Sequence, residues 1–114
     1  MQGMNDLATH KIALTTTSET YRVRICDIMY CISSNSYTTF YLQYGQKQIV
    51  TRSIRYYEGL LTSYGFIRTH PSYLVNKEYV QRISRKEGIS LILQDGAIIP
   101  VSKNKKTEVM AQLI

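Results

Sequence analysis

Hydrophobic and polar residues alternate with a period close to two over much of the chain from Lys11 onward. Side chains two positions apart in an extended backbone lie on the same face, so the alternation predicts β-strands that each bury one face. The strand at 27–32 is apolar on both faces, which places it in the middle of a sheet. The predicted strands are 21–25, 27–32, 37–42, 47–51, 80–84, 89–93 and 98–101.

The period changes to that of a helix in two places. Ser53 can cap a helix that ends before Gly65, a residue suited to a left-handed carboxy-terminal cap. The apolar stripe of this helix consists of Ile54, Tyr57, Leu60, Leu61 and Tyr64. The tail at 102–114 is also predicted to be helical, because its apolar residues recur at helical spacing. Strands therefore dominate the fold, and two short helices accompany them.

The segment 66–76, with the sequence FIRTHPSYLVN, holds the most distinctive group of side chains. As an extended strand it would place Arg68, His70 and Ser72 on one polar face. Pro71 lacks a backbone N–H, so regular strand pairing should stop there. This half of the segment is a candidate recognition element.

The second half of the same segment has a structural character. Tyr73, Leu74 and Val75 are expected to anchor it in the core. Asn76 is expected to cap a short turn that begins at Lys77.

The length of 114 residues suits one domain with its own core, which we place at 11–114. Residues 1–10 are polar and are expected to be disordered or derived from cloning. The chain has 14 Lys and Arg against 8 Asp and Glu, a formal charge of +6. A basic surface favours polyanions as partners, although many basic domains bind none.

Cys26 and Cys31 are too few for a secreted disulfide framework and indicate reduced thiols in a cytoplasmic protein. No apolar run is long enough to span a bilayer, so no membrane contact is expected. Enzyme chemistry is poorly supported, because His10 and His70 are the only histidines and no metal-ligand, nucleotide-loop or nucleophile motif is present. We therefore expect neither catalysis, nor a cofactor, nor a small-molecule substrate.

Three other features each have two interpretations. Lys103, Lys105 and Lys106 lie where the predicted tail helix begins, so they either accompany a bound anion or form a solvated basic turn, which is slightly favoured for the lysines alone. The polar residues 33–38 form a hairpin loop that can also hydrogen-bond bases or phosphates. The 10 tyrosines could stack on single-stranded nucleic acid, but most are expected to pack in the sheet.

In combination, these blocks resemble the LytTR-type DNA-binding domain of bacterial response regulators. The resemblance is carried by Asp27-Ile28-Met29-Tyr30, by Tyr37 after a polar loop, by the helix ending at Gly65, and above all by the pattern F-x-R-x-H-x-S-Y-L-V-N at 66–76. It implies small packed antiparallel β-sheets with two short helices, rather than a helix-turn-helix. It also implies loops that enter successive major grooves of duplex DNA.

By position, the resemblance implies three contact segments. The first segment (35–39) comprises Asn35, Ser36, Tyr37, Thr38 and Thr39; the second segment (70–72) comprises His70 and Ser72, with Arg68 beside it; the third segment (103–106) comprises Lys103, Asn104 and Lys106.

The sequence departs from the family pattern at three positions. Pro71 stands where the family usually has a basic or polar residue, so the second segment is expected to position phosphates more than to read bases. Ile32 stands where an acidic residue is common, and Thr38 where a larger polar reader can occur. The target sequence is therefore not transferable from relatives.

The sequence thus predicts a sequence-specific duplex DNA-binding domain, the output module of a bacterial transcription regulator. Expected partners are double-stranded DNA with paired direct repeats and an amino-terminal receiver or sensor domain. Two alternatives are a single-stranded nucleic-acid binder that stacks bases on its tyrosines and a protein-interaction module.

Overall fold

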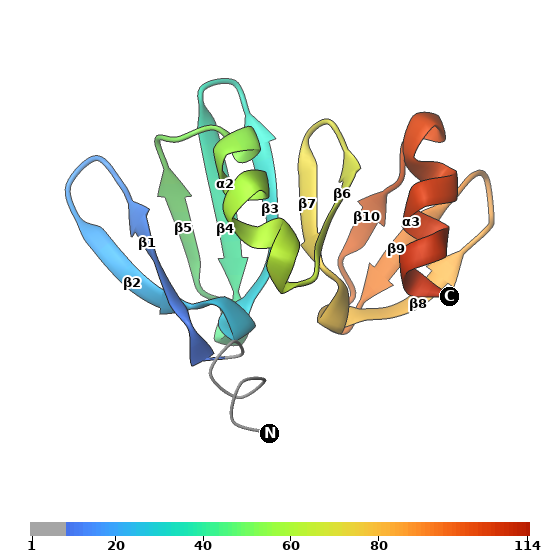
Figure 1. Ribbon diagram of the computed structural model, residues 1–114, viewed down its shortest axis with the longest axis horizontal. Helices are drawn as coiled ribbons and strands as arrows, with labels where there is room; N and C mark the ends of the chain where they lie inside the picture. The colour runs from blue at the N-terminus through green and yellow to red at the C-terminus, as the bar shows by residue number, and fades with distance from the viewer. Residues whose placement is uncertain (1–8) are drawn as a thin grey trace.

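The computed structural model describes residues 9–114, and the chain in this range is built mainly from antiparallel strands (Figure 1). The strands are β1 (Lys11–Thr15), β2 (Thr20–Arg24), β3 (Ile28–Ser34), β4 (Tyr37–Leu42), β5 (Lys47–Val50), β6 (Phe66–His70), β7 (Tyr73–Asn76), β8 (Val80–Ser84), β9 (Ser90–Leu93) and β10 (Ile98–Pro100). The helices are α2 (Ile54–Leu61) and α3 (Lys106–Leu113).

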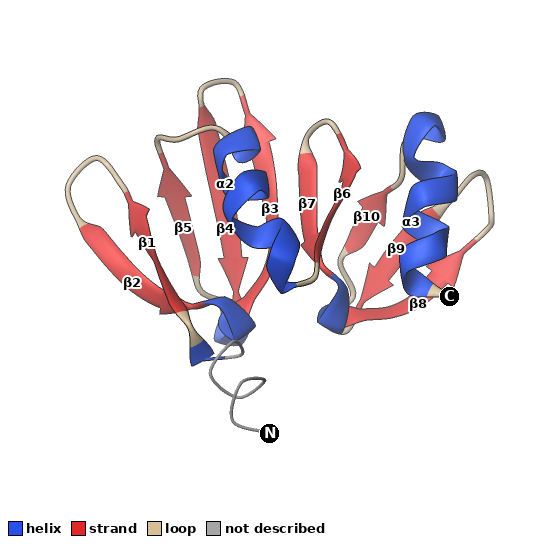
Figure 2. Ribbon diagram, viewed as in Figure 1, coloured by secondary structure: helices blue, strands red, loops and turns tan. Residues whose placement is uncertain are grey.

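The described strands form three antiparallel sheets. The central sheet has five strands in the order β5-β4-β3-β7-β6, with the β1–β2 hairpin beside β5 and the three-stranded sheet β10-β9-β8 beyond β6 (Figure 2). The prediction of small packed antiparallel sheets with two short helices is confirmed. The strand 27–32, expected in the middle of a sheet, corresponds to β3, the central strand of five.

Two hydrophobic cores lie on opposite faces of the central sheet. Helix α2 covers one face, where Phe40 and Tyr57 meet edge to face at 4.7 Å between ring centroids. Sheet β8–β10 and helix α3 cover part of the other face, where Val109 of α3 is fully buried. Burial on both faces explains why β3 is apolar along its whole length.

The signals predicted for helix α2 appear at its two ends. Ser53 caps it, with its hydroxyl accepting a hydrogen bond from the Tyr56 N–H at 3.3 Å. Gly65 ends the following 3-10 turn with a φ of 91°, a conformation that glycine adopts at little cost. The predicted apolar stripe is wrong at Leu60, which is 40% exposed.

Two β-bulges alter the faces that simple alternation predicts. The pairing of β3 with β4 shifts between Ile28 and Tyr30, so Ile28 enters the core under α2 and Tyr30 enters the other core. The alternation had placed both residues on one face. The second bulge lies in β6 between Arg68 and His70, and it changes the candidate recognition element.

The prediction of a disordered amino terminus falls mostly on residues 1–8, which lie outside the described residues. His10 is held in place: its carbonyl accepts a hydrogen bond from the Ile25 N–H at 2.8 Å, and its ring lies 5.7 Å from that of Tyr64.

Candidate nucleic-acid interface

The three predicted contact segments lie along one edge of the molecule, the upper edge in Figure 1. We call this the contact edge; it comprises the β3–β4 turn, the β6–β7 turn and the 3-10 turn Lys103–Lys105 before α3. Backbone hydrogen bonds join the strands and turns that carry the segments. The Ser33 N–H donates to the Ser72 carbonyl at 2.9 Å, and the Ser102 N–H donates to the Thr69 carbonyl at 2.9 Å.

The first segment begins with a tight turn of two exposed residues, Asn35 and Ser36. Asn35 has a φ of 55°, a left-handed conformation that asparagine tolerates better than most residues. Tyr37 follows with 48% of its surface exposed, and Thr39 is half-buried. The turn therefore presents an amide, a hydroxyl and a phenol to solvent.

Thr38 belongs to the interior. Strand β4 directs Thr38, like Phe40, to the face covered by α2, and the Thr38 side chain is fully buried. Its hydroxyl donates to the Arg52 carbonyl at 2.8 Å. The expectation that Thr38 faces DNA is therefore not consistent with its burial, and we remove it from the candidate interface.

The second segment is a turn in which one ring nitrogen of His70 accepts a hydrogen bond from the backbone. The Ser72 N–H donates to His70 Nδ1 at 3.0 Å, so Nδ1 acts as an acceptor and a neutral His70 carries its proton on Nε2. The His70 ring also contacts that of Tyr73 edge to face at 5.5 Å. His70 and Ser72 are both half-buried, and Pro71 between them is exposed.

Arg68 does not share the face of His70, contrary to the prediction. The bulge at Thr69 leaves Arg68 opposite Leu74 on the side of α2, while His70 pairs with Tyr73. The Arg68 side chain is only 17% exposed, and its guanidinium is engaged within the protein. The polar face predicted from alternation is thus divided between the two sides of the sheet.

The third segment presents Lys103, Asn104 and Lys106, all of them exposed. The predicted excess of positive charge at the start of the helix is partly offset, because Lys105 Nζ lies 3.7 Å from Glu108 in the first turn of α3. An acidic residue in that turn also suits the helix dipole. Two lysines and one amide remain directed to solvent.

Sequence reasoning missed two cations near the contact edge. Arg52 lies in the connection between β5 and α2, with its guanidinium carbon 4.3 Å from the centre of the Tyr56 ring, and Arg55 lies exposed in the first turn of α2. This connection reaches the same edge (Figure 1). Both arginines are close in sequence to Ser53, the predicted helix cap, and this was the sequence signal that could have identified them.

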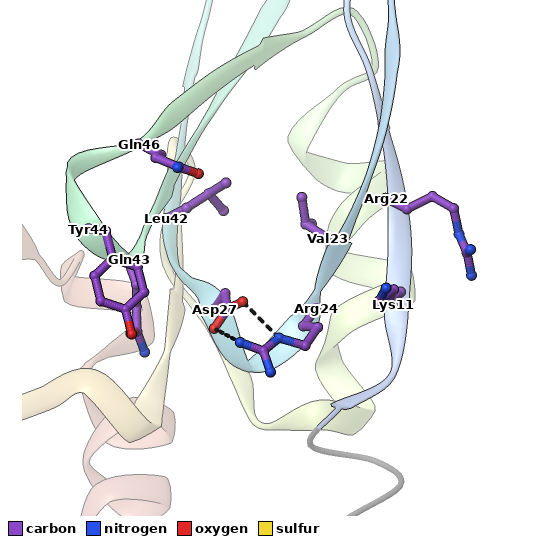
Figure 3. Close-up of a pocket in the computed structure, with 9 residues that line it drawn as sticks. All are labelled: Lys11, Arg22, Val23, Arg24, Asp27, Leu42, Gln43, Tyr44 and Gln46. Carbon is purple, nitrogen blue, oxygen red and sulfur yellow. Dashed lines mark hydrogen bonds and ion pairs between the residues drawn. The ribbon is translucent and has the colours of Figure 1, made fainter.

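A hollow of about 280 Å³ lies at the other end of the central strands, between the β1–β2 hairpin and the turn after β4 (Figure 3). Arg24 and Asp27 line the hollow and form an ion pair at 3.0 Å, and the Arg22 side chain extends away from the hollow. None of the predicted contact residues lines this hollow. Within residues 9–114, no group of three His, Cys, Asp or Glu side chains is placed to hold a metal ion. No helix in that range has the length and apolar character needed to cross a membrane.

The arrangement defines a class of protein: a small β-rich domain that presents turns and cations along one edge. The sequence matches the family model of the LytTr DNA-binding domain over residues 18–114. The chain therefore belongs to the LytTr DNA-binding domain family, a family of DNA-binding domains.

Two relatives are similar to the chain. The sensory transduction protein LytT of Bacillus subtilis is 30% identical over 101 residues, which cover 87% of this chain and 42% of that protein. The chain thus spans less than half the length of this relative. The solved LytTr DNA-binding domain of a response regulator from Bacillus cereus has the same fold, with a TM-score of 0.78, 24% identity, and coverage of 90% of this chain and 95% of that one.

Proposed function

We propose that the domain binds duplex DNA sequence-specifically, as the output module of a bacterial transcription regulator, through the contact edge. The observation that carries the proposal is the alignment of three separate turns on this edge, joined by backbone hydrogen bonds. Exposed cations flank the turns. Two acids, Glu58 and Glu108, lie near the turns, and each is paired with a cation of the same region.

The dimensions of the domain suit two successive major grooves. Its longest extents are 40 Å, whereas the major groove of B-DNA returns to the same face after about 34–36 Å. The first segment would enter one groove and the third segment the next, with the second segment over the phosphates between them. Asn35 and Asn104 are the candidate base readers, since an amide side chain can pair with adenine through two hydrogen bonds.

The cations would provide the sequence-independent part of the affinity. Lys103 and Lys106 are exposed at the third segment, and Arg52 and Arg55 extend the positive surface beyond the first. Each phosphate neutralised by such a group lowers the slope of log K against log salt by about 0.9. A strongly salt-dependent affinity is therefore expected.

The experiment is selection of bound duplexes from a random pool, followed by titration of the selected duplex at several salt concentrations. Lys103→Ala should weaken binding and reduce the salt slope by about 0.9. Lys47→Ala is the matched control, because Lys47 is exposed at the start of β5, away from the contact edge. Absence of binding to any duplex, or equal effects of the two substitutions, would refute the proposal.

Single-stranded nucleic acid is the main competitor to be tested in the same assay. The exposed tyrosines do not form one stacking platform. Tyr37 lies at the contact edge, Tyr44 lies beside the hollow at the other end, Tyr21 lies on β2, and Tyr56 is covered by Arg52. Excess single strand should therefore fail to displace the duplex.

Two partners of the whole protein follow from the same proposal. LytT is more than twice as long as the matched region, so a receiver or sensor domain attached to this one is proposed. A single domain covers about one helical turn, so recognition of paired direct repeats would require two domains on one DNA.

A further inference from the structure

We infer that Glu58 and Arg68 position the second segment for DNA, and that Glu58, an acid, is required for full DNA affinity. The inference rests on the proposed function. It assigns a role to Glu58 of helix α2, whose side chain pairs with Arg68 and whose negative charge alone would disfavour binding to a polyanion.

The guanidinium of Arg68 holds the backbone of the turn from inside. Its Nε donates to the His70 carbonyl at 3.2 Å, and Nη2 donates to the Pro71 carbonyl at 2.5 Å. These two carbonyls belong to the tip of the β6–β7 turn. Pro71 is the first of the two residues between β6 and β7, a position where no backbone N–H is needed for closure of the turn, and the arginine adds side-chain donors to the carbonyls of the turn.

Glu58 fixes the guanidinium in this place. Its Oε1 accepts from Arg68 Nη1 at 2.6 Å, and the two side chains are 34% and 17% exposed. A charge-assisted bond between partly desolvated groups is stronger than one at the open surface. Helix α2 and the β6–β7 turn are thereby joined through one arginine.

The position of this turn affects the rest of the contact edge. The Ser72 carbonyl accepts the N–H of Ser33, which lies in β3 just before the first segment, and the Thr69 carbonyl accepts the N–H of Ser102, the residue before the third segment. A shift of the turn would therefore move the base-reading segments relative to each other. Small errors of this kind weaken a multi-point contact more than the loss of a single contact does.

The sign of one substitution tests the inference. Glu58→Ala removes a negative charge near a polyanion, so electrostatics alone predicts equal or tighter DNA binding. Loss of the positioning contact predicts weaker binding instead, by at least about fivefold, the factor expected for losing one hydrogen bond of ordinary strength. Alanine also favours helix, so α2 should remain folded.

Two further variants give the contrast. Glu58→Gln keeps an acceptor for Arg68 without the charge, so its affinity should lie between those of Glu58→Ala and the unchanged domain. Glu108→Ala is the matched control, because Glu108 is 57% exposed beside the third segment and pairs with Lys105 at 3.7 Å. This control should bind DNA as tightly as the unchanged domain or more tightly.

The outcomes are separable. If the unchanged domain binds no duplex, the proposed function fails and not this inference alone. If it binds and both Glu58 variants bind equally well or better, the inference is overturned. The amide resonance of Ser72 provides an independent readout: Glu58→Ala should shift it, whereas Glu108→Ala should leave it in place. Should Glu58→Ala not fold, the DNA affinities of Glu58→Gln and Glu108→Ala are compared instead: weaker binding by Glu58→Gln alone supports the inference, and equal binding by the two overturns it.

Discussion

Replacement of Thr38 by valine separates a structural role from a DNA contact. Valine has nearly the same shape as threonine, so the change removes the hydroxyl and leaves the packing in place. The hydroxyl donates to the Arg52 carbonyl at 2.8 Å, and the side chain has no exposed surface. The structure therefore predicts a loss of stability without a comparable loss of DNA affinity.

The expected magnitude is that of one neutral hydrogen bond. Such a bond contributes about 1 kcal/mol net to folding, and the orphaned carbonyl belongs to an exposed residue, so water can replace part of the interaction. For a domain of this size, about 1 kcal/mol corresponds to a decrease in Tm of about 4 °C. Thr38→Ser is the control, because serine keeps the hydroxyl and removes only a methyl group.

The assay combines urea unfolding, followed by circular dichroism, with titration of the selected duplex. Thr38→Val should lower the urea midpoint with an unchanged m-value and alter DNA affinity by less than about twofold, well below the cost of a lost base contact. The reasoning is refuted if Thr38→Val unfolds like the unchanged domain but binds DNA several-fold more weakly while Thr38→Ser binds normally. That result would place the hydroxyl at the DNA.

Three other predictions concern groups whose environment the structure defines. Burial raises the pKa of the Cys31 thiol well above its ordinary value. At pH 8 a thiol reagent should therefore label Cys26→Ser, which keeps Cys31, only as fast as the domain unfolds, and should label Cys31→Ser, which keeps the half-buried Cys26, much faster. Equal labelling rates of the two variants would contradict this. Burial also raises the pKa of Tyr30 to about 12, so the folded state retains a proton that the unfolded state releases near pH 10, and stability present below pH 10 should be lost as the pH rises toward 12. Tyr30→Phe should lose less stability over that interval, as measured by urea midpoints at both ends, and parallel losses would count against burial as the cause. Finally, ¹⁵N NMR of the free domain at pH 8 should show His70 as the tautomer with the proton on Nε2, because Nδ1 accepts from the Ser72 N–H at 3.0 Å; the opposite tautomer would exclude that bond.

The parts of the fold that depend on local signals were predictable from the sequence. Ser53 and Gly65 mark the ends of the α2 region through capping and a positive φ. Asn76 does cap the turn at Lys77–Tyr79, with its side chain accepting from the Glu78 N–H at 3.1 Å. Each of these depends on residues within a few positions, so a short stretch of sequence contains the cause.

The bulges were not predictable by alternation, because a bulge depends on the partner strand. Thr69 is the extra residue in β6 only because β7 pairs with it in a particular register. The bulge then separates Arg68 from His70 and directs Arg68 to Glu58, a residue on another element. For the candidate interface, the sequence predicted three segments that the structure places along one edge, but it assigned Thr38 and Arg68 to that surface, where their side chains do not lie.

The contact edge shows how very short turns are held in fixed positions relative to one another. The β3–β4 turn has two residues, and the 3-10 turn before α3 has three, too few to hold a conformation by their own contacts. Their geometry comes from the strands beneath, through the bonds from Ser33 to Ser72 and from Ser102 to Thr69. Under the proposed function, recognition and folding are therefore coupled: substitutions beneath the β6–β7 turn should change DNA affinity even where no side chain reaches DNA, whereas substitutions at the exposed tips should change affinity alone.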